Sequence, residues 1–197
     1  MKAGLVAVAV IALALIMALA WFVSVGNDLV AHEQTVRQAW AQVQNVYQRR
    51  ADLIPNLVET VKGFAAQERT VLEEVTRARA TVAGMQVTPE VLRDPDTLRK
   101  FQEAQAQLGG ALGRLLAVVE RYPDLKSNQN FLALQSQLEG TENRIAVERR
   151  RYNEAVRAYN TTVRRFPSSL VASLRGYSER PYFEASPGSE AAPAIKF

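Results

Sequence analysis

An uncharged segment near the N-terminus constrains this chain more than any other feature. From Ala3 to Val25 the sequence reads AGLVAVAVIALALIMALAWFVSV, 23 residues without a charged side chain. As an α-helix this segment is about 34 Å long, enough to cross a hydrocarbon core of about 30 Å. Trp21 and Phe22 come near its end, where aromatic side chains favour the membrane interface. The sequence therefore predicts a transmembrane anchor over residues 1–26 and a function performed at a membrane.

A cleaved secretory signal is the alternative interpretation of this segment. The N-terminus is positive, and residues 18–20 (ALA) resemble a cleavage site. The apolar run is longer than the roughly 7–15 residues of a typical signal, which favours a retained single-pass anchor. Lys2 precedes the span, whereas the first basic residue after it is Arg37. Because positive charge stays in the cytoplasm, we expect the rest of the chain on the extracytoplasmic side of a bacterial inner membrane, with the cytoplasmic side as the alternative.

The remainder of the chain has the pattern of long amphipathic helices. From Val36 to Val82, apolar residues recur at alternating steps of four and three. Pro55 lies inside this run, yet the apolar stripe keeps its phase across it, so we expect one long kinked helix over residues 28–83. Two helices meeting at Ile54-Pro55 are the alternative. Further stripes predict two long helices and a short fourth element, over residues 96–122, 128–166 and 168–175.

Short connections between these helices predict antiparallel neighbours, and no strand pattern appears. The predicted fold class is therefore all-α, an N-terminal transmembrane helix followed by an antiparallel up-and-down bundle of long helices over residues 27–185. Residues 186–197 are rich in proline and small side chains and are predicted to form a flexible tail. Three glycines interrupt the second helix, and they indicate either a close approach of helices or a mobile turn: Gly109, Gly110 and Gly113.

Part of the first predicted helix lacks a partner, because this helix is about twice as long as the second. The excess lies toward the membrane and carries Val36, Trp40, Val43 and Tyr47. An uncovered apolar stripe is expected to pack on another surface. We therefore predict these four residues as the contact of a homo-oligomer. A third helix long enough to cover them is the alternative.

Polar side chains gather near Pro55 and in the third predicted helix. They are Arg49, Arg50, Asp52, Asn56, Glu142, Asn143 and Arg144. One interpretation is a polar patch that binds a partner or another copy. The other is a structural set of interhelical ion pairs and hydrogen bonds that fixes the register of the helices and satisfies the backbone freed by the proline.

The sequence is poor in groups that carry chemistry. It has no cysteine, one histidine, and no HExxH, P-loop or GxSxG motif, so we predict no catalytic, cofactor-binding or metal-binding residues. Glu68 and Glu148 fall on apolar stripes, where we expect them to meet arginines or to lie at a splayed end of the bundle. Tyrosines at 152 and 159 share one helix face and are expected in the core, with hydrogen-bonded hydroxyls. The net charge is only +4, and the basic residues are interspersed with acidic ones, which does not favour nucleic-acid binding. No small-molecule substrate is indicated.

Several strings resemble the LemA family. They are RRADLIPNLVETVKGFAAQE at 49–68, LLAVVERYPDLKSNQNFLALQSQLEGTENRI at 115–145, YNEAVRAYNTTVRRFP at 152–167 and YFEA at 182–185. The resemblance implies a transmembrane helix, an antiparallel helical bundle and no known enzymatic activity. It also implies a cytoplasmic bundle, opposite to the charge argument, and loose links to membrane-protease quality control and to magnetosome membranes.

These observations lead to one principal hypothesis about function. We expect a non-enzymatic single-pass membrane protein that acts as a self-associating scaffold or adaptor at the membrane surface, without a cofactor. A regulatory or adaptor subunit of a membrane protease quality-control complex is the alternative.

Overall fold

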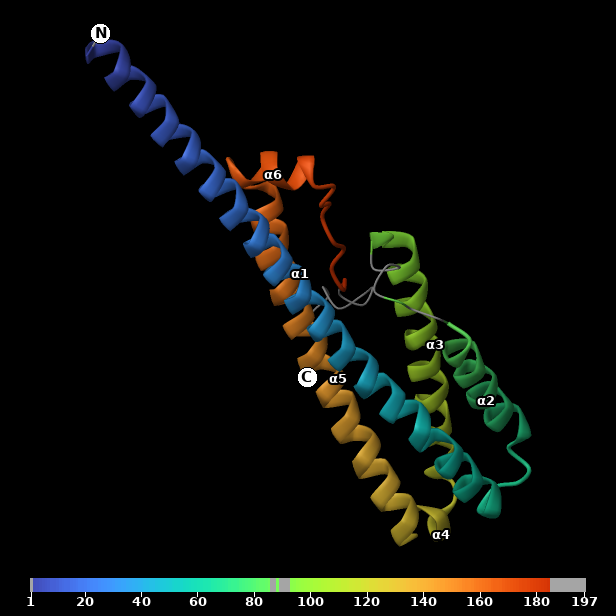
Figure 1. Cartoon of the computed structure of the whole chain (residues 1–197). Coiled ribbons are helices and arrows are strands. Elements are labelled where there is room, and N and C mark those ends of the chain that lie inside the picture. The colour runs from blue at the N-terminus through green and yellow to red at the C-terminus, as the bar shows by residue number, and fades with distance from the viewer. Residues whose placement is uncertain (1, 86–87, 89–92, 185–197) are drawn as a thin grey trace, which may run out of the picture.

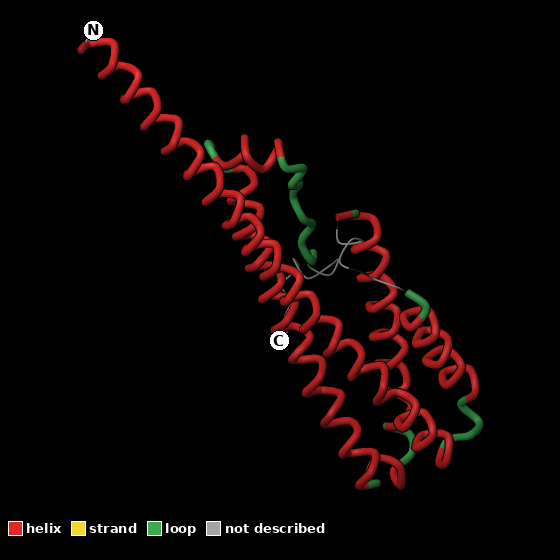
Figure 2. Tube along the Cα trace, viewed as in Figure 1, coloured by secondary structure: helices red, strands yellow, loops and turns green. Residues whose placement is uncertain are grey.

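The computed structural model describes residues 2–85, 88 and 93–184. Within these residues all regular secondary structure is helical, which confirms the all-α prediction (Figure 2). The helices are α1 Lys2–Phe64, α2 Arg69–Ala83, α3 Pro95–Val119, α4 Pro123–Lys126, α5 Gln129–Arg164 and α6 Ser168–Leu174. The predicted tail, residues 186–197, lies outside the described residues.

The uncharged segment forms the first part of α1 and projects away from the bundle (Figure 1). Of the described helices, α1 alone is long and apolar enough to cross a membrane, and the most apolar stretch of it is 0% buried. No break separates this stretch from the bundle, because α1 continues as one helix to Phe64. The apolar segment and the bundle are therefore joined by a continuous helix.

The first predicted bundle helix is in fact two helices. Because α1 ends at Phe64 and α2 begins at Arg69, both the single helix over residues 28–83 and the break at Ile54-Pro55 are wrong. The turn between the helices is held by tertiary contacts: the Glu68 carboxylate accepts a hydrogen bond of 2.9 Å from the Tyr122 hydroxyl. The apolar period continues through the turn because α2 folds back onto the same core.

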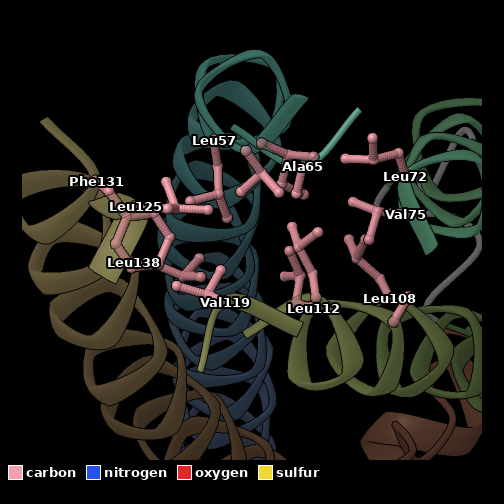
Figure 3. Close-up of a cluster of buried hydrophobic side chains, with 14 residues drawn as sticks. Leu57, Ala65, Leu72, Val75, Leu108, Leu112, Val119, Leu125, Phe131 and Leu138 are labelled. Carbon is pink, nitrogen blue, oxygen red and sulfur yellow. The ribbon is translucent and has the colours of Figure 1, made fainter. Parts of the chain in front are cut away.

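The helices α1, α2, α3 and α5 alternate in direction, so the bundle is an up-and-down arrangement of four long helices rather than three (Figure 1). The core at the end far from the N-terminus takes side chains from α1 through α5 (Figure 3). Leu57, Leu72, Leu112, Leu125 and Phe131 are buried there, one from each of these five helices.

The predicted oligomer contact lies inside the bundle instead of on its surface. Val36, Trp40, Val43 and Tyr47 are at most 7% exposed, so the expectation that this stripe is uncovered is wrong. The rings nearest to Trp40 belong to α3, α5 and the C-terminal segment, with centroid distances of 5.6 Å to Phe101, 5.7 Å to Tyr152 and 6.0 Å to Phe183. A long α5 and the C-terminal segment, residues 177–184, provide the cover.

The C-terminal segment is bound to α5 by two asparagines spaced seven residues apart. Asn153 donates to the Phe183 carbonyl at 2.9 Å and accepts from the Phe183 backbone N–H at 2.8 Å. Asn160 makes the same two bonds with the backbone of Arg180, at 2.9 and 2.8 Å. Each side-chain amide thus satisfies a backbone donor and acceptor that a lone extended segment would leave unpaired.

Two buried tyrosines beside these asparagines complete the attachment, as expected for core tyrosines with bonded hydroxyls. Tyr159 donates its hydroxyl to the Ser178 carbonyl at 2.9 Å, and Tyr152 donates to the Pro181 carbonyl at 3.3 Å. Burial raises the pKa of both phenols, so they keep their protons at neutral pH and remain donors.

Candidate functional site

A buried arginine joins the three longest helices of the bundle. Arg50 on α1 is 4% exposed, and its guanidinium donates to Glu142 on α5 at 2.8 Å. It also donates to the side-chain carbonyl oxygen of Gln105 on α3. A buried cation needs such partners, since a charge without them is costly. The planar guanidinium reaches two helices at once, which a lysine ammonium could not do in the same geometry.

A cleft of about 550 Å³ opens beside this arginine. Arg149 on α5 lies at its edge and donates to the Glu184 carbonyl at 2.8 Å, so the C-terminal segment forms one wall. The Arg50 Nε and the Gln105 Nε2 are buried without a hydrogen-bond partner among the described residues. Both residues line the cleft, but these two nitrogen atoms are themselves buried and do not face its open space.

The described lining of the cleft offers hydrogen-bonding and charged groups, including the carboxylates of Glu103 and Glu142. Burial raises the pKa of Tyr47 at its wall, while the nearby Arg149 and Arg50 lower it in part, so the phenol stays neutral at physiological pH. Nucleophilic catalysis needs a nucleophile beside a general base. The cleft lining consists of arginine, glutamine, glutamate, tyrosine and small or apolar residues, and the described part of it brings together no such pair.

The structure brings together only two of the seven predicted polar residues, Arg50 and Glu142. Asp52 instead accepts from Gln48 in the same helix at 2.7 Å. The side chains of the other four are exposed: Arg49, Asn56, Asn143 and Arg144. Arg50 and Glu142 thus fit the structural interpretation, whereas the exposed members leave the interaction interpretation open.

The backbone freed by the proline is satisfied by a residue that sequence reasoning missed. Pro55 has no N–H, so the Ala51 carbonyl four residues earlier loses its normal donor within α1. Arg79 on α2 donates its Nε–H to that carbonyl at 2.9 Å. This bond explains how α1 continues through the proline, and it also fixes α2 against α1. No pattern around Arg79 marks it in the sequence.

The two carboxylates on apolar stripes meet arginines, as predicted. Glu68 pairs with Arg121 at 3.0 Å, and Glu148 pairs with Arg151 at 2.7 Å. Within the described ranges, no group of three histidine, cysteine or acidic residues lies close enough together to hold a metal ion. These carboxylates are therefore accounted for by ion pairs.

A second hollow lies between α1 and α2, in the half of the bundle far from the N-terminus. It is an open groove of about 620 Å³ whose lining includes Val58, Leu72, Glu59 and Arg69. Apolar residues and both signs of charge alternate along it. This mixture does not select one class of ligand, although the groove adds the Lys62 ammonium and the Thr76 hydroxyl to the groups found in the polar cleft.

Comparison with known proteins identifies relatives over most of the chain. The model of the LemA family matches residues 39–197. Magnetosome protein MamQ 2 of Paramagnetospirillum magneticum is 27% identical over 180 residues, covering 83% of this chain and 66% of that protein. MamQ of Magnetospirillum gryphiswaldense is 25% identical with the same coverage. Protein LemA of Metamycoplasma hominis is 24% identical over 168 residues, covering 84% of this chain and 73% of that protein. The chain thus spans slightly less than two thirds of the MamQ relatives.

Proposed function

This chain belongs to the LemA family and is membrane-associated, and from that premise we propose that it acts as a non-enzymatic scaffold or adaptor at the membrane surface. Residues 1–26 serve as the retained anchor and residues 27–185 as the working domain. The domain faces the extracytoplasmic side of a bacterial inner membrane. The MamQ relatives, named as magnetosome proteins, support work at a membrane.

The continuity of α1 carries this proposal. One helix runs from Lys2 to Phe64, so the apolar segment and a helix of the bundle core are the same rigid element. A flexible tether would let the domain sample many orientations, whereas a continuous helix holds it at one height and angle to the bilayer. Such an arrangement suits a protein that presents a surface to neighbours in the membrane.

Self-association is the second part of the proposal. Confinement to a membrane raises the effective concentration of copies, so a weak contact is enough to hold them together. Because the stripe of Val36, Trp40, Val43 and Tyr47 is buried, we infer a contact elsewhere on the domain. We place it at the exposed polar residues Arg49, Asn143 and Arg144, where the neighbouring carboxylates of Asp52 and Glu142 offer opposite charges to the arginines of a second copy.

The particle mass of the full chain in mild detergent tests this proposal. We expect a homomer by light scattering, and we expect Arg144→Glu to reduce its mass. Arg157→Glu is the matched control, since Arg157 is also an exposed arginine on α5. An unchanged mass in Arg144→Glu would exclude this contact. A monomer that brings down no other protein would contradict the scaffold, and stoichiometric co-purification of a protease would favour the alternative of a protease subunit.

A further inference from the structure

The short helix α6 lies against the end of the uncharged segment. Val171 and Ala172 on its inner face are each 1% exposed, and the residues packed around them include Phe22 and Val25. Both of these belong to the run without charges. Figure 1 shows α6 crossing the end of the bundle nearest the N-terminus, beside α1. If the run spans a bilayer, α6 is therefore at the boundary between hydrocarbon and headgroups.

The outer face of this region is apolar and uncovered. Phe166 is 77% exposed, Leu170 57% and Leu174 79%, among the highest values for large apolar side chains outside the span. Their spacing of four residues places Leu170 and Leu174 on one face of α6, opposite the buried pair, and Phe166 just before it. In water this cluster would be unfavourable, whereas at a bilayer surface it would be buried.

Arginines flank the same cluster. Arg165 precedes α6 and Arg175 follows it, and neither forms an ion pair with any residue in the described part of the chain. The Arg175 guanidinium lies 5.2 Å from the ring centre of Phe22. It also lies over Gly26, where any Cβ atom would collide with it. The fold thus brings a cation from late in the chain to the last turns of the span.

We propose that α6 is a second membrane contact, which lies in the interface and binds anionic phospholipid headgroups. Phe166, Leu170 and Leu174 enter the edge of the acyl-chain region, while Arg165 and Arg175 extend to the phosphates. Only the anchor part of the proposed function is needed for this inference. The contact adds a second point of attachment beside α1 and thereby fixes the rotation of the bundle about the axis of the span.

A lipid surface fits this cluster better than a second copy of the chain. The cluster is continuous with the span, so a bilayer that surrounds Phe22 and Val25 also reaches α6. A symmetric contact between copies would bring four arginines together with two acids, the Asp28 that lines the same hollow as Arg165 in each copy, and the excess of like charge would repel. The charge is instead complementary to anionic lipid.

Site-directed spin labelling tests the proposal in the full chain, which has no cysteine of its own. The variant Leu174→Cys is labelled with a nitroxide and placed in bilayers of phosphatidylcholine, with or without phosphatidylglycerol. We expect the ratio of oxygen to aqueous nickel-chelate accessibility to be several-fold higher than for Leu132→Cys. Leu132 is a matched control because it is a leucine that is 48% exposed and lies near the first turn of α5, at the end of the bundle far from the span.

Two further variants separate the possible outcomes. Leu13→Cys lies in the span and reports whether the anchor is in the bilayer. If the label at position 13 is in lipid but the label at position 174 is in water, the inference about α6 is overturned and the anchor is supported. Exposure to water at positions 13 and 174 would overturn the membrane anchor as well as the α6 contact. Phosphatidylglycerol should move the label at Leu174→Cys deeper into the bilayer, which raises its oxygen-to-nickel accessibility ratio. The double change Arg165→Gln with Arg175→Gln should abolish this dependence on phosphatidylglycerol. If the dependence remains, headgroup binding by the arginines is contradicted. Dipolar broadening between labels at position 174 would show a second copy on the patch and also overturn the proposal.

Discussion

Arg180 and Glu33 form a 2.7 Å ion pair across a sequence separation of 147 residues. Their side chains are only 6% and 12% exposed. The pair connects the C-terminal segment to α1 just beyond the uncharged run. The backbone of Arg180 is also hydrogen-bonded to Asn160. The ion pair and these hydrogen bonds together fix the C-terminal segment over the core that contains Trp40.

Loss of the Glu33 carboxylate should destabilise the protein strongly. In Glu33→Ala the Arg180 guanidinium stays buried without its counter-charge, and breaking such a pair costs about 3–5 kcal/mol. Urea unfolding of the full chain in detergent, followed by circular dichroism, measures the change. Glu59→Ala is the control, because its pair with Lys62 is exposed and is worth less than about 1 kcal/mol. An equal loss of unfolding free energy in the two variants would show that the buried Glu33–Arg180 pair stabilises the protein no more than an exposed pair does.

Alkaline pH should weaken the fold through the buried tyrosines. Burial raises the pKa of Tyr152 in the folded state, whereas the unfolded phenol titrates at about 10. The folded pKa is the higher one, so this stabilisation is complete below pH of about 10 and is lost as the pH rises toward the folded pKa, at about 1.4 kcal/mol per pH unit. Tyr152→Phe should therefore lose less stability than wild type above that pH in urea titrations. The same alkaline slope in both would contradict this assignment.

The helical stripes predicted α3, α5 and α6 closely, because each has its own apolar face and a clear start and stop. The turn between α1 and α2 was missed for a physical reason. Its residues continue the apolar period, and the contacts that bend the chain come from Tyr122, more than 50 residues away. The predicted contact residues of the oligomer were wrong for a different reason: α5 and the C-terminal segment cover the part of α1 that α3 leaves unmatched.

The candidate site was predictable only in part. Arg50 and Glu142 stood out as polar residues on helical faces, and Gln105 occupied a position on the apolar stripe of its helix, which is the signal that could have joined it to them. The wall formed by Glu184 could not be predicted, because an extended segment without periodicity carries no sign of where it binds. Arg79 was missed because its partner is a backbone carbonyl.

The glycines of α3 do not serve a close approach of helices. A Cβ atom added at Gly113 would meet no atom within 4 Å. Gly113→Ala should therefore raise the free energy of unfolding by about 0.5–1 kcal/mol, because alanine favours the helix and restricts the unfolded chain. Gly176→Ala is the control: Gly176 has a φ of +72°, so alanine there should destabilise the protein. A loss of stability in Gly113→Ala, measured by urea unfolding, would indicate a contact made only in an assembly.

The charges around the span predict the orientation of the bundle. Lys2 lies before it and Arg37 is the first basic residue after it, so we expect the bundle outside the cytoplasm. Protease added to intact spheroplasts should then digest the bundle, while a cytoplasmic marker protein survives. Survival of the bundle until the membrane is lysed would instead establish the cytoplasmic orientation.

A double-mutant cycle tests the link between Pro55 and Arg79. In the wild type, Arg79 supplies the donor that Pro55 withholds from the Ala51 carbonyl, so Arg79→Met should cost about 1–3 kcal/mol by leaving that acceptor unpaired. Pro55→Ala restores the backbone donor within α1. Arg79→Met should therefore cost markedly less in the Pro55→Ala background, with a coupling of about 1 kcal/mol or more in urea unfolding. Glu74→Met on the same helix is the control, because its exposed pair with Arg114 does not involve the carbonyl and should show no coupling to position 55. Additive effects of the Pro55 and Arg79 changes would mean that solvent, rather than Arg79, satisfies the carbonyl.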